Sequence, residues 1–186
     1  MTDLLQRYGQ RLAILSMDQM SLYFQATLTR VWAPVGQTPV IRITPQRDMT
    51  HFYGALEVQL GREIAVPAPE QTGAVTADFM RLLLLLFPTH HILLLLDRAP
   101  WHHGPEIRQL LAENDRLELL YYPVACPELN PQEHVWERAR DAISHNHQYR
   151  SFEPLIADFE TYLNETLFEC DFIEQCGPPP NAVIFN

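Results

Sequence analysis

Alternating apolar and polar positions divide the first part of the chain into strands. The pattern predicts strands over residues 11–20, 21–31 and 49–60, with a tight turn between the first two. Residues 40–43 have the same β pattern, and Pro34, Gly36 and Pro39 interrupt the chain around them. A turn beginning at Gly61 ends this region, which we interpret as a meander of three strands.

The rest of the chain alternates between helical spacing and short apolar runs. Apolar residues recur at helical spacing over residues 76–87, and residues 91–96 form a continuous apolar run typical of a strand buried on both faces. Further elements are predicted in chain order: a helix over residues 105–114, a strand over 117–122, a helix opening at Asn130 and Pro131, and a helix over 152–168. Residues 177–180 are expected to form a stiff, Pro-rich tail.

This order of elements predicts a mixed α/β layout, with a strand meander followed by alternating helices and strands. A chain of 186 residues with 47% hydrophobic content can bury one substantial core, so we expect a single domain over residues 1–186. The core is expected to span about residues 11–145. The last helix and the tail are expected to occupy residues 151–186. Two of the predicted strands end in acidic residues.

The composition and the N-terminal sequence indicate in which cellular compartment the protein is expected. No run of about 18 apolar residues is present, so we expect no membrane span. The N-terminus has no apolar segment followed by a cleavage site, so we expect a cytoplasmic protein without a secretory signal. Cys126, Cys170 and Cys176 form no Cys-x-x-Cys pair and are expected to be free thiols. A disulfide between Cys170 and Cys176 is disfavoured in that compartment.

The formal net charge of −10 argues against tight binding of nucleic acid over the whole surface, because like charges repel. Carboxylates that hold divalent cations contribute negative charge by necessity. The arginines are gathered in parts of the chain, notably Arg30, Arg42, Arg47, Arg138 and Arg140. The average charge therefore leaves room for a local basic groove.

Three acids stand where metal ligands are expected. Asp18 and Asp97 lie at the predicted ends of two strands, and Glu133 lies in the first turn of a predicted helix. Mg²⁺ and Mn²⁺ prefer hard oxygen ligands, and a site with two ions about 4 Å apart needs carboxylates from separate elements. Taken singly, each acid also fits a structural role, as a solvated turn residue or as a favourable charge at a helix N-terminus.

The sequence around these acids resembles the catalytic domain of DDE transposases of the IS630 and Tc1/mariner group. Residues 95–102 (LLDRAPWH) are similar to the motif of the second aspartate, and residues 127–136 (PELNPQEHVW) to the third motif, Pro-Glu-Leu-Asn-Pro-x-Glu followed by Trp. Residues 32–37 (WAPVGQ) resemble the Trp-x-Pro-x-Gly stretch that follows the first aspartate. Thirty-five residues separate Asp97 from Glu133, close to the short interval typical of this group.

The resemblance covers about residues 12–143 and implies an RNase H-like α/β fold: a mixed sheet with a three-stranded meander, two further strands and flanking helices. It implies that Asp18, Asp97 and Glu133 are catalytic and bind two Mg²⁺ or Mn²⁺ ions. The implied reactions are DNA cleavage and strand transfer by in-line phosphoryl transfer. Three further residues are candidates for substrate contact: His102, Arg98 and Asn130.

Several side chains near the acids are candidates for roles other than substrate contact. His102 is a candidate for tuning the metal site, and Asn130 for capping the helix and so orienting Glu133. Trp136 is expected to anchor that helix in the core. Gln19 stands where many relatives have glutamate, and its side chain is expected to point to the opposite face of the strand from the first aspartate.

The resemblance also bears on partners. Relatives carry N-terminal helix-turn-helix modules, whereas here 17 residues precede Asp18, so we expect no such domain in this chain. The expected partners are transposon-end and target DNA, a separate DNA-binding chain and a second copy in a homodimer, with a nucleoid-associated location. Two alternatives are a catalytically silent remnant or regulatory module with the same fold, and an unrelated metal-dependent hydrolase.

Overall fold

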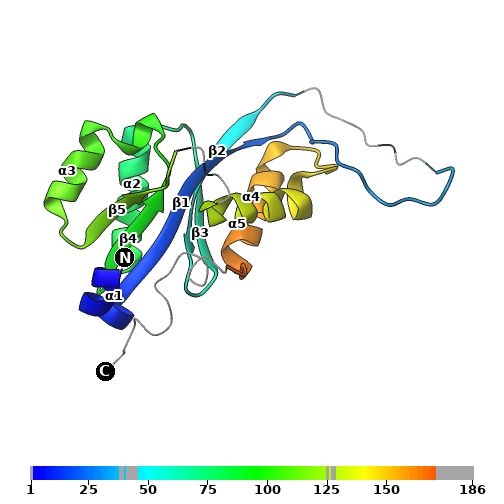
Figure 1. Ribbon diagram of the computed structural model, residues 1–186. Coiled ribbons are helices and arrows are strands. Elements are labelled where there is room, and N and C mark those ends of the chain that lie inside the picture. Colours follow the sequence, from blue (N-terminus) through cyan, green and yellow to red (C-terminus); the bar gives the residue numbers. More distant parts are fainter. Residues whose placement is uncertain (1, 38–39, 41–45, 125, 127–128, 171–186) are drawn as a thin grey trace.

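The fold is built on one five-stranded sheet, seen in a computed structural model that describes residues 2–37, 40, 46–124, 126 and 129–170 (Figure 1). The strands are β1 (Leu12–Tyr23), β2 (Met49–Glu57), β3 (Arg62–Ala68), β4 (His91–Leu96) and β5 (Leu117–Tyr121). Their order in the sheet is β3-β2-β1-β4-β5. The first three form an antiparallel meander, whereas β4 and β5 run parallel to β1.

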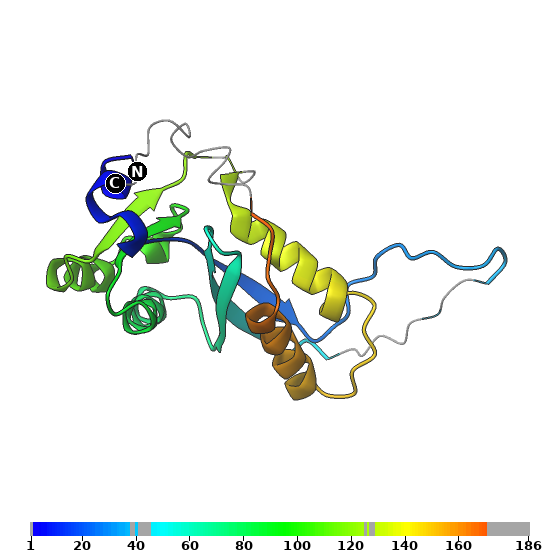
Figure 2. The ribbon, with the colours of Figure 1, turned by 90° about the horizontal axis from the view of Figure 1, so that it is seen from below.

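Helices cover both faces of this sheet. They are α1 (Thr2–Tyr8), α2 (Gly73–Leu86), α3 (Pro105–Glu113), α4 (Pro131–Ala139) and α5 (Phe152–Glu165). α2 and α3 lie on one side of the sheet, and α4 and α5 on the other (Figure 2). Short helical turns also occur at Gly9–Arg11 and Pro100–His102, and a π-helical turn at Arg140–Ser144 follows α4.

Side chains that alternate between the two faces of β1 contribute to both main hydrophobic cores. Leu15 and Met17 pack in the cluster beneath α2 and α3, and Met20 and Leu22 pack in the cluster beneath α4 and α5. Ser16, which lies between the first two of these, faces the same side as α4, since it donates a hydrogen bond to Asn130. Ser16 and Asp18, on this face of β1, therefore point toward the N-terminus of α4.

The meander differs from the predicted one in two strands. β1 continues without a turn to Tyr23, so the predicted break after residue 20 and the predicted strand over residues 21–31 are wrong. The reason is that Met20 and Leu22 are buried and the backbone stays paired with β2 as far as Tyr23. The third strand is instead β3, an edge strand that contains Pro67, a residue that sheets tolerate at such edges. The strand predicted over residues 40–43 lies outside the described residues except for Val40.

The later elements follow the predicted pattern closely. β4 has the predicted bounds, and α3 and β5 differ from theirs by one residue at one end. α2 begins earlier than predicted because Thr72 accepts a hydrogen bond from the amide of Val75 and caps the helix. α5 ends at Glu165, three residues before the predicted end. The predicted Pro-rich tail and Cys176 lie outside the described residues.

Residues 28–37 leave the sheet as an extended arm (Figure 1).

Within the part of the chain that the structure describes, no helix is long and apolar enough to cross a bilayer.

Gly54 of β2 occupies a site with no room for a side chain. It pairs with Asp18 on β1 and with Ala65 on β3. A Cβ atom there would collide with the Glu63 carboxyl and the Trp136 ring, and would lie 2.6 Å from Gln132 Nε2. The close approach of α4 to the sheet therefore depends on glycine at this position.

We predict that Gly54→Ala lowers the free energy of unfolding by about 1–3 kcal/mol, because α4 must shift to accept the methyl group. Urea unfolding followed by circular dichroism measures the change. Gly73→Ala is the matched control, since its Cβ atom first meets the movable end of Glu106 at 3.0 Å. Equal stability of Gly54→Ala and the wild-type chain would contradict the packing described for Gly54.

Candidate active site

Asp18 and Asp97 come together because β1 and β4 are parallel neighbours. Ser16 is opposite Leu95, and two residues further along each strand stand Asp18 and Asp97. β4 ends just before Asp97, but β1 continues past Asp18, which corrects the expectation that both acids end a strand. The shared register places the two side chains on the same face of the sheet.

The N-terminus of α4 brings Glu133 to the same place. A cavity of about 550 Å³ is lined by Asp18, Asp97 and Glu133, together with Asn130 and Arg98. Among the residues that the structure describes, no three His, Cys, Asp or Glu side chains cluster tightly enough to hold a metal ion. The three acids therefore face one cavity without sharing one ligand position.

The donor set of the cavity suits hard divalent cations. Its acidic side chains offer carboxylate oxygens, which Mg²⁺ and Mn²⁺ prefer. Burial, together with the negative charges of Glu133 and Asp97, raises the pKa of Asp18 from 3.8 to about 6, although hydrogen bonds to its carboxylate act in the opposite direction. A cation between these carboxylates would relieve that repulsion. The residues present therefore fit a divalent metal site.

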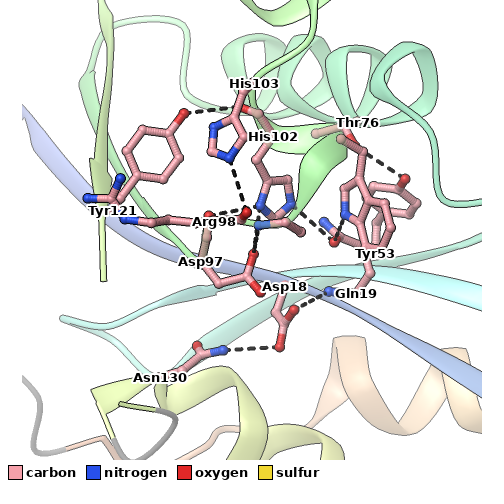
Figure 3. A network of polar contacts seen from close by, with 12 residues as sticks. Asp18, Gln19, Tyr53, Thr76, Asp97, Arg98, His102, His103, Tyr121 and Asn130 are labelled. Carbon is pink, nitrogen blue, oxygen red and sulfur yellow. Dashed lines mark hydrogen bonds and ion pairs between the residues drawn. The ribbon is translucent and has the colours of Figure 1, made fainter. Parts of the chain in front are cut away.

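Asn130 ties Asp18 to α4 (Figure 3). Its Nδ2 donates to Asp18 Oδ2 at 3.0 Å, and its Oδ1 accepts from Ser16 Oγ at 3.0 Å and from the amide of Gln132 at 3.2 Å. The last bond makes Asn130 the N-cap of α4, as expected from the sequence. One amide thus joins the first acid to the helix that carries Glu133.

His102 holds Asp97 from the opposite side (Figure 3). The imidazole is fully buried, and its Nδ1 lies 2.8 Å from Asp97 Oδ1. The amide of Ala99 donates to the same carboxylate oxygen at 2.9 Å. The hydrogen bond from His102 is the main cause that holds the pKa of Asp97 below its usual range. Asp97 is therefore held ionised in one orientation.

Gln19 is a site residue whose role the sequence pattern does not show. Its Oε1 accepts from Trp101 Nε1 at 2.7 Å and lies 3.1 Å from His102 Nε2. Because an indole N–H can only donate, Trp101 fixes which end of the Gln19 amide faces the histidine. Gln19 also lines the cavity and, through His102, is linked to Asp97. Alternation along the strand had suggested only that it points away from Asp18.

Arg98 is exposed at the rim of the cavity, immediately after Asp97. Its guanidinium carbon lies 5.5 Å from the centre of the Tyr121 ring, and His103 Nε2 lies 3.1 Å from its backbone oxygen. The Tyr121 hydroxyl donates to the carbonyl of His102 at 2.9 Å. The rim is thus connected to the buried imidazole behind it. Of the arginines proposed for a basic groove, Arg42 lies outside the described residues.

The chain matches the DDE superfamily endonuclease family over residues 13–156, a span that contains all three acids. It therefore belongs to this family. The resemblance inferred from residues 95–102 and 127–136 is confirmed. Membership also removes the alternative of an unrelated metal-dependent hydrolase.

Two curated relatives are similar to this chain over part of their own length. The "Insertion element IS630 uncharacterized 39 kDa protein" of Shigella sonnei is 27% identical over 143 residues, which cover 75% of this chain and 41% of that protein. The "Uncharacterized protein y4pE/y4sA" of Sinorhizobium fredii is 33% identical over 66 residues, which cover 36% of this chain and 46% of that protein. The chain thus spans less than half the length of these relatives.

Solved structures of similar shape include the Mos1 transposase paired-end complex with the left transposon end, with a TM-score of 0.69 and 16% identity. That match covers 95% of this chain and 55% of the Mos1 chain. The catalytic domain of the Mos1 mariner transposase matches with a TM-score of 0.62 and 13% identity, over 95% of this chain and 82% of that domain. The RNase H-like α/β fold is therefore confirmed.

We predict that Asp18→Asn stabilises the metal-free protein relative to wild type by an amount that grows between about pH 4 and about pH 6. The folded pKa of Asp18 is about 6 and its ordinary value is 3.8. Between these values the unfolded chain has released a proton that the folded chain retains, so wild-type stability falls as pH rises. The pH-dependent part of the difference reaches about 3 kcal/mol at most and is constant above about pH 7.

Urea unfolding of both proteins at several pH values across this range measures the difference. Asp78→Asn is the control, because its side chain is 74% exposed on α2. A difference between Asp18→Asn and wild type that does not change with pH would contradict the environment assigned to Asp18.

Proposed function

We propose that this chain is the catalytic domain of a transposase that cleaves DNA and joins DNA ends with two Mg²⁺ or Mn²⁺ ions. The observation that best supports this function is that Asp18, Asp97 and Glu133 line one cavity in a chain of the DDE superfamily endonuclease family. Mos1 paired-end complexes have been solved with Mn and with Mg, which supports the same ions here.

The proposed ligands are Asp18, Asp97 and Glu133. The backbone N–H of Gln19 donates to Asp18 Oδ1 at 2.7 Å, and Asn130 Nδ2 donates to Asp18 Oδ2 at 3.0 Å, so both carboxylate oxygens are held. Bound ions would stabilise the charge that develops on the attacking and leaving oxygens of an in-line phosphoryl transfer. Asp18 and Asp97 are therefore oriented by contacts within the protein, as electrostatic catalysis requires.

The three candidates for substrate contact differ in how deeply their side chains are buried. Arg98 is exposed at the cavity rim, so we propose that its guanidinium binds a phosphate of the DNA backbone. His102 and Asn130 are 0% and 9% exposed, and both contact an aspartate. Their proposed role is to position Asp97 and Asp18. Since the cavity is acidic, a phosphodiester approaches it favourably only when cations are present.

The proposed DNA partners are transposon ends and target DNA. The related Mos1 structure contains a left transposon end, which supports this substrate class. With a formal net charge of −10, the chain is expected to bind DNA weakly unless another module or chain supplies a basic contact. Binding to chromosomal DNA would place it in the cytoplasm at the nucleoid.

We further propose that two copies of the chain act together as a homodimer, because two ends have to be brought together. The arm formed by residues 28–37 protrudes from the sheet (Figure 1). Its large apolar side chains are exposed. Trp32 and Val35 have relative exposures of 104% and 105%. Apolar side chains gathered on one protruding segment are typical of a contact surface.

A catalytically silent domain with the same fold is the second candidate. It is favoured by the spacing of the acids, because no three ligating side chains within the described residues stand close enough to hold an ion as they are placed. A silent domain would fold normally and bind neither cation. Metal binding therefore separates the two candidates before any DNA assay.

We predict that wild-type protein binds Mn²⁺ and nicks DNA, and that Asp97→Asn lowers both Mn²⁺ affinity and nicking rate by more than about 100-fold. Loss of an outer partner of a metal ligand already costs about 10–100-fold in affinity, so loss of the ligand itself costs more. Calorimetric titration and a plasmid-nicking assay measure the two effects. Asp78→Asn, at an exposed site, is expected to behave as wild type. Wild-type protein that binds no Mn²⁺ would favour the silent domain.

We predict that Trp32→Ser combined with Val35→Ser weakens self-association at least about tenfold, because each loses apolar area from the proposed contact. Sedimentation equilibrium with and without DNA measures the dimer fraction. Leu85→Ser is the matched control, since Leu85 of α2 is 76% exposed and lies away from the arm. Wild-type protein that stays monomeric at all concentrations, with and without DNA, would exclude the dimer.

A further inference from the structure

The side chain of Gln132 is buried completely, although glutamine is usually found at protein surfaces. It directly precedes Glu133 in the first turn of α4. Its Oε1 accepts from the amide of Leu56 on β2 at 3.1 Å. Its Nε2 donates to Glu63 Oε1 on β3 at 2.7 Å. One side chain of α4 is therefore bonded to two strands of the sheet.

Glu63 is the second member of this buried pair and is 2% exposed. Its carboxyl also accepts a hydrogen bond from the amide of Ala55. Burial raises the pKa of Glu63 well above its usual range, which favours the neutral form of the carboxyl. A neutral acid and an amide form a hydrogen-bonded pair without a buried charge.

The pair is enclosed by the residues already described around Gly54. Trp136 lies one turn after Gln132 on α4, and its ring occupies the space above Gly54 together with Glu63 and Gln132. Trp136 is 1% exposed. Since the enclosure leaves no room for a Cβ atom at Gly54, the Gln132 amide has little freedom to take another position.

Two polar attachments thus hold the beginning of α4. Asn130 binds Asp18 on β1, and Gln132 binds Leu56 on β2 and Glu63 on β3. Glu133 is the next residue, and its own side chain is exposed in the cavity. The first turn of α4 is therefore bonded to three strands of the sheet through these two side chains.

We propose that Gln132 is a positioning residue, whose amide, bonded to Leu56 and Glu63, sets the place of Glu133 relative to Asp18 and Asp97. The inference rests on the proposed metal-dependent function and adds to it a residue that touches neither metal nor DNA. An apolar side chain at position 132 would leave the Leu56 amide and the Glu63 carboxyl buried without this partner. The first turn of α4 would then shift to let water reach them, and Glu133 would shift with it.

The test is a double-mutant cycle on Mn²⁺ affinity, with wild type, Gln132→Met, Glu133→Ala and the double variant. Gln132→Met is expected to weaken Mn²⁺ binding at least about tenfold, as loss of an outer partner does. In the Glu133→Ala background the same change is expected to alter affinity by less than about twofold, because Gln132 acts through Glu133. Hydrogen exchange of the Leu56 amide, expected to be faster in Gln132→Met, reports the broken contact without using metal.

Two controls separate this role from general damage. Gln109→Met makes the same substitution at an exposed position of α3 and is expected to bind Mn²⁺ as wild type does. Glu63→Gln keeps a neutral acceptor for Gln132 and is also expected to stay within about threefold of wild type. If Gln132→Met does not fold, a double variant that carries both Glu63→Gln and Gln132→Glu takes its place. This exchange variant keeps one amide and one carboxyl in the pair. It is expected to recover the Mn²⁺ affinity that Gln132→Glu alone loses.

The possible results lead to different conclusions. Wild-type protein that binds no Mn²⁺ would overturn the proposed metal site and this role with it. Wild-type binding together with an equal effect of Gln132→Met in both backgrounds would overturn only the positioning role. An exchange variant that binds no better than Gln132→Glu would do the same.

Discussion

Parallel pairing between β1 and β4 is the contact on which the site depends. It brings together Asp18 and Asp97, which are separated in sequence by β2, β3 and α2. The pairing also fixes the face on which they lie, because a slip of one residue would send one carboxylate to the opposite side of the sheet. α4 then has to approach that face closely to add Glu133, and the glycine opposite Asp18 permits this approach.

Each acid is supported by an amide or a histidine, and none of these contacts is an arginine. Asp18 is bonded to Asn130, Asp97 to His102, and the turn that carries Glu133 is held by Gln132. Amides orient a carboxylate without neutralising it, whereas an arginine would compensate its charge. The cavity therefore combines fixed geometry with unsatisfied negative charge, the combination that attracts divalent cations.

Much of the fold follows from local sequence pattern, and the exceptions have physical reasons. The bounds of β4 could be predicted because five consecutive apolar residues after His91, buried on both faces, are typical of a central strand. β1 was predicted too short, because polar residues at its centre, Asp18 and Gln19, look like the end of a strand when the cavity they line is unknown. β3 was missed because an edge strand with a proline has a weak pattern.

The acids themselves were predicted from the motifs around them, and the structure brings all three to one cavity. Their supporting residues were harder to find. A buried glutamine such as Gln132 has no periodic or compositional signal, because its importance lies in which strands happen to stand opposite it. In the sequence Gln19 differs from the family pattern and carries no other signal, because its contact with His102 depends on a loop whose course the sequence does not specify.

The raised pKa of Asp18 gives the cavity a consequence for folding as well as for chemistry. Burial and the negative charges of Glu133 and Asp97 make the ionised form of Asp18 oppose the native state, so an ion that bound only the folded chain would act as a folding ligand. At a free concentration of about 100 times its dissociation constant, such an ion adds about 2.7 kcal/mol to the stability of the native state. The supply of divalent cations in the surroundings would thereby govern how much of the chain is folded at any moment, and how readily proteases remove it.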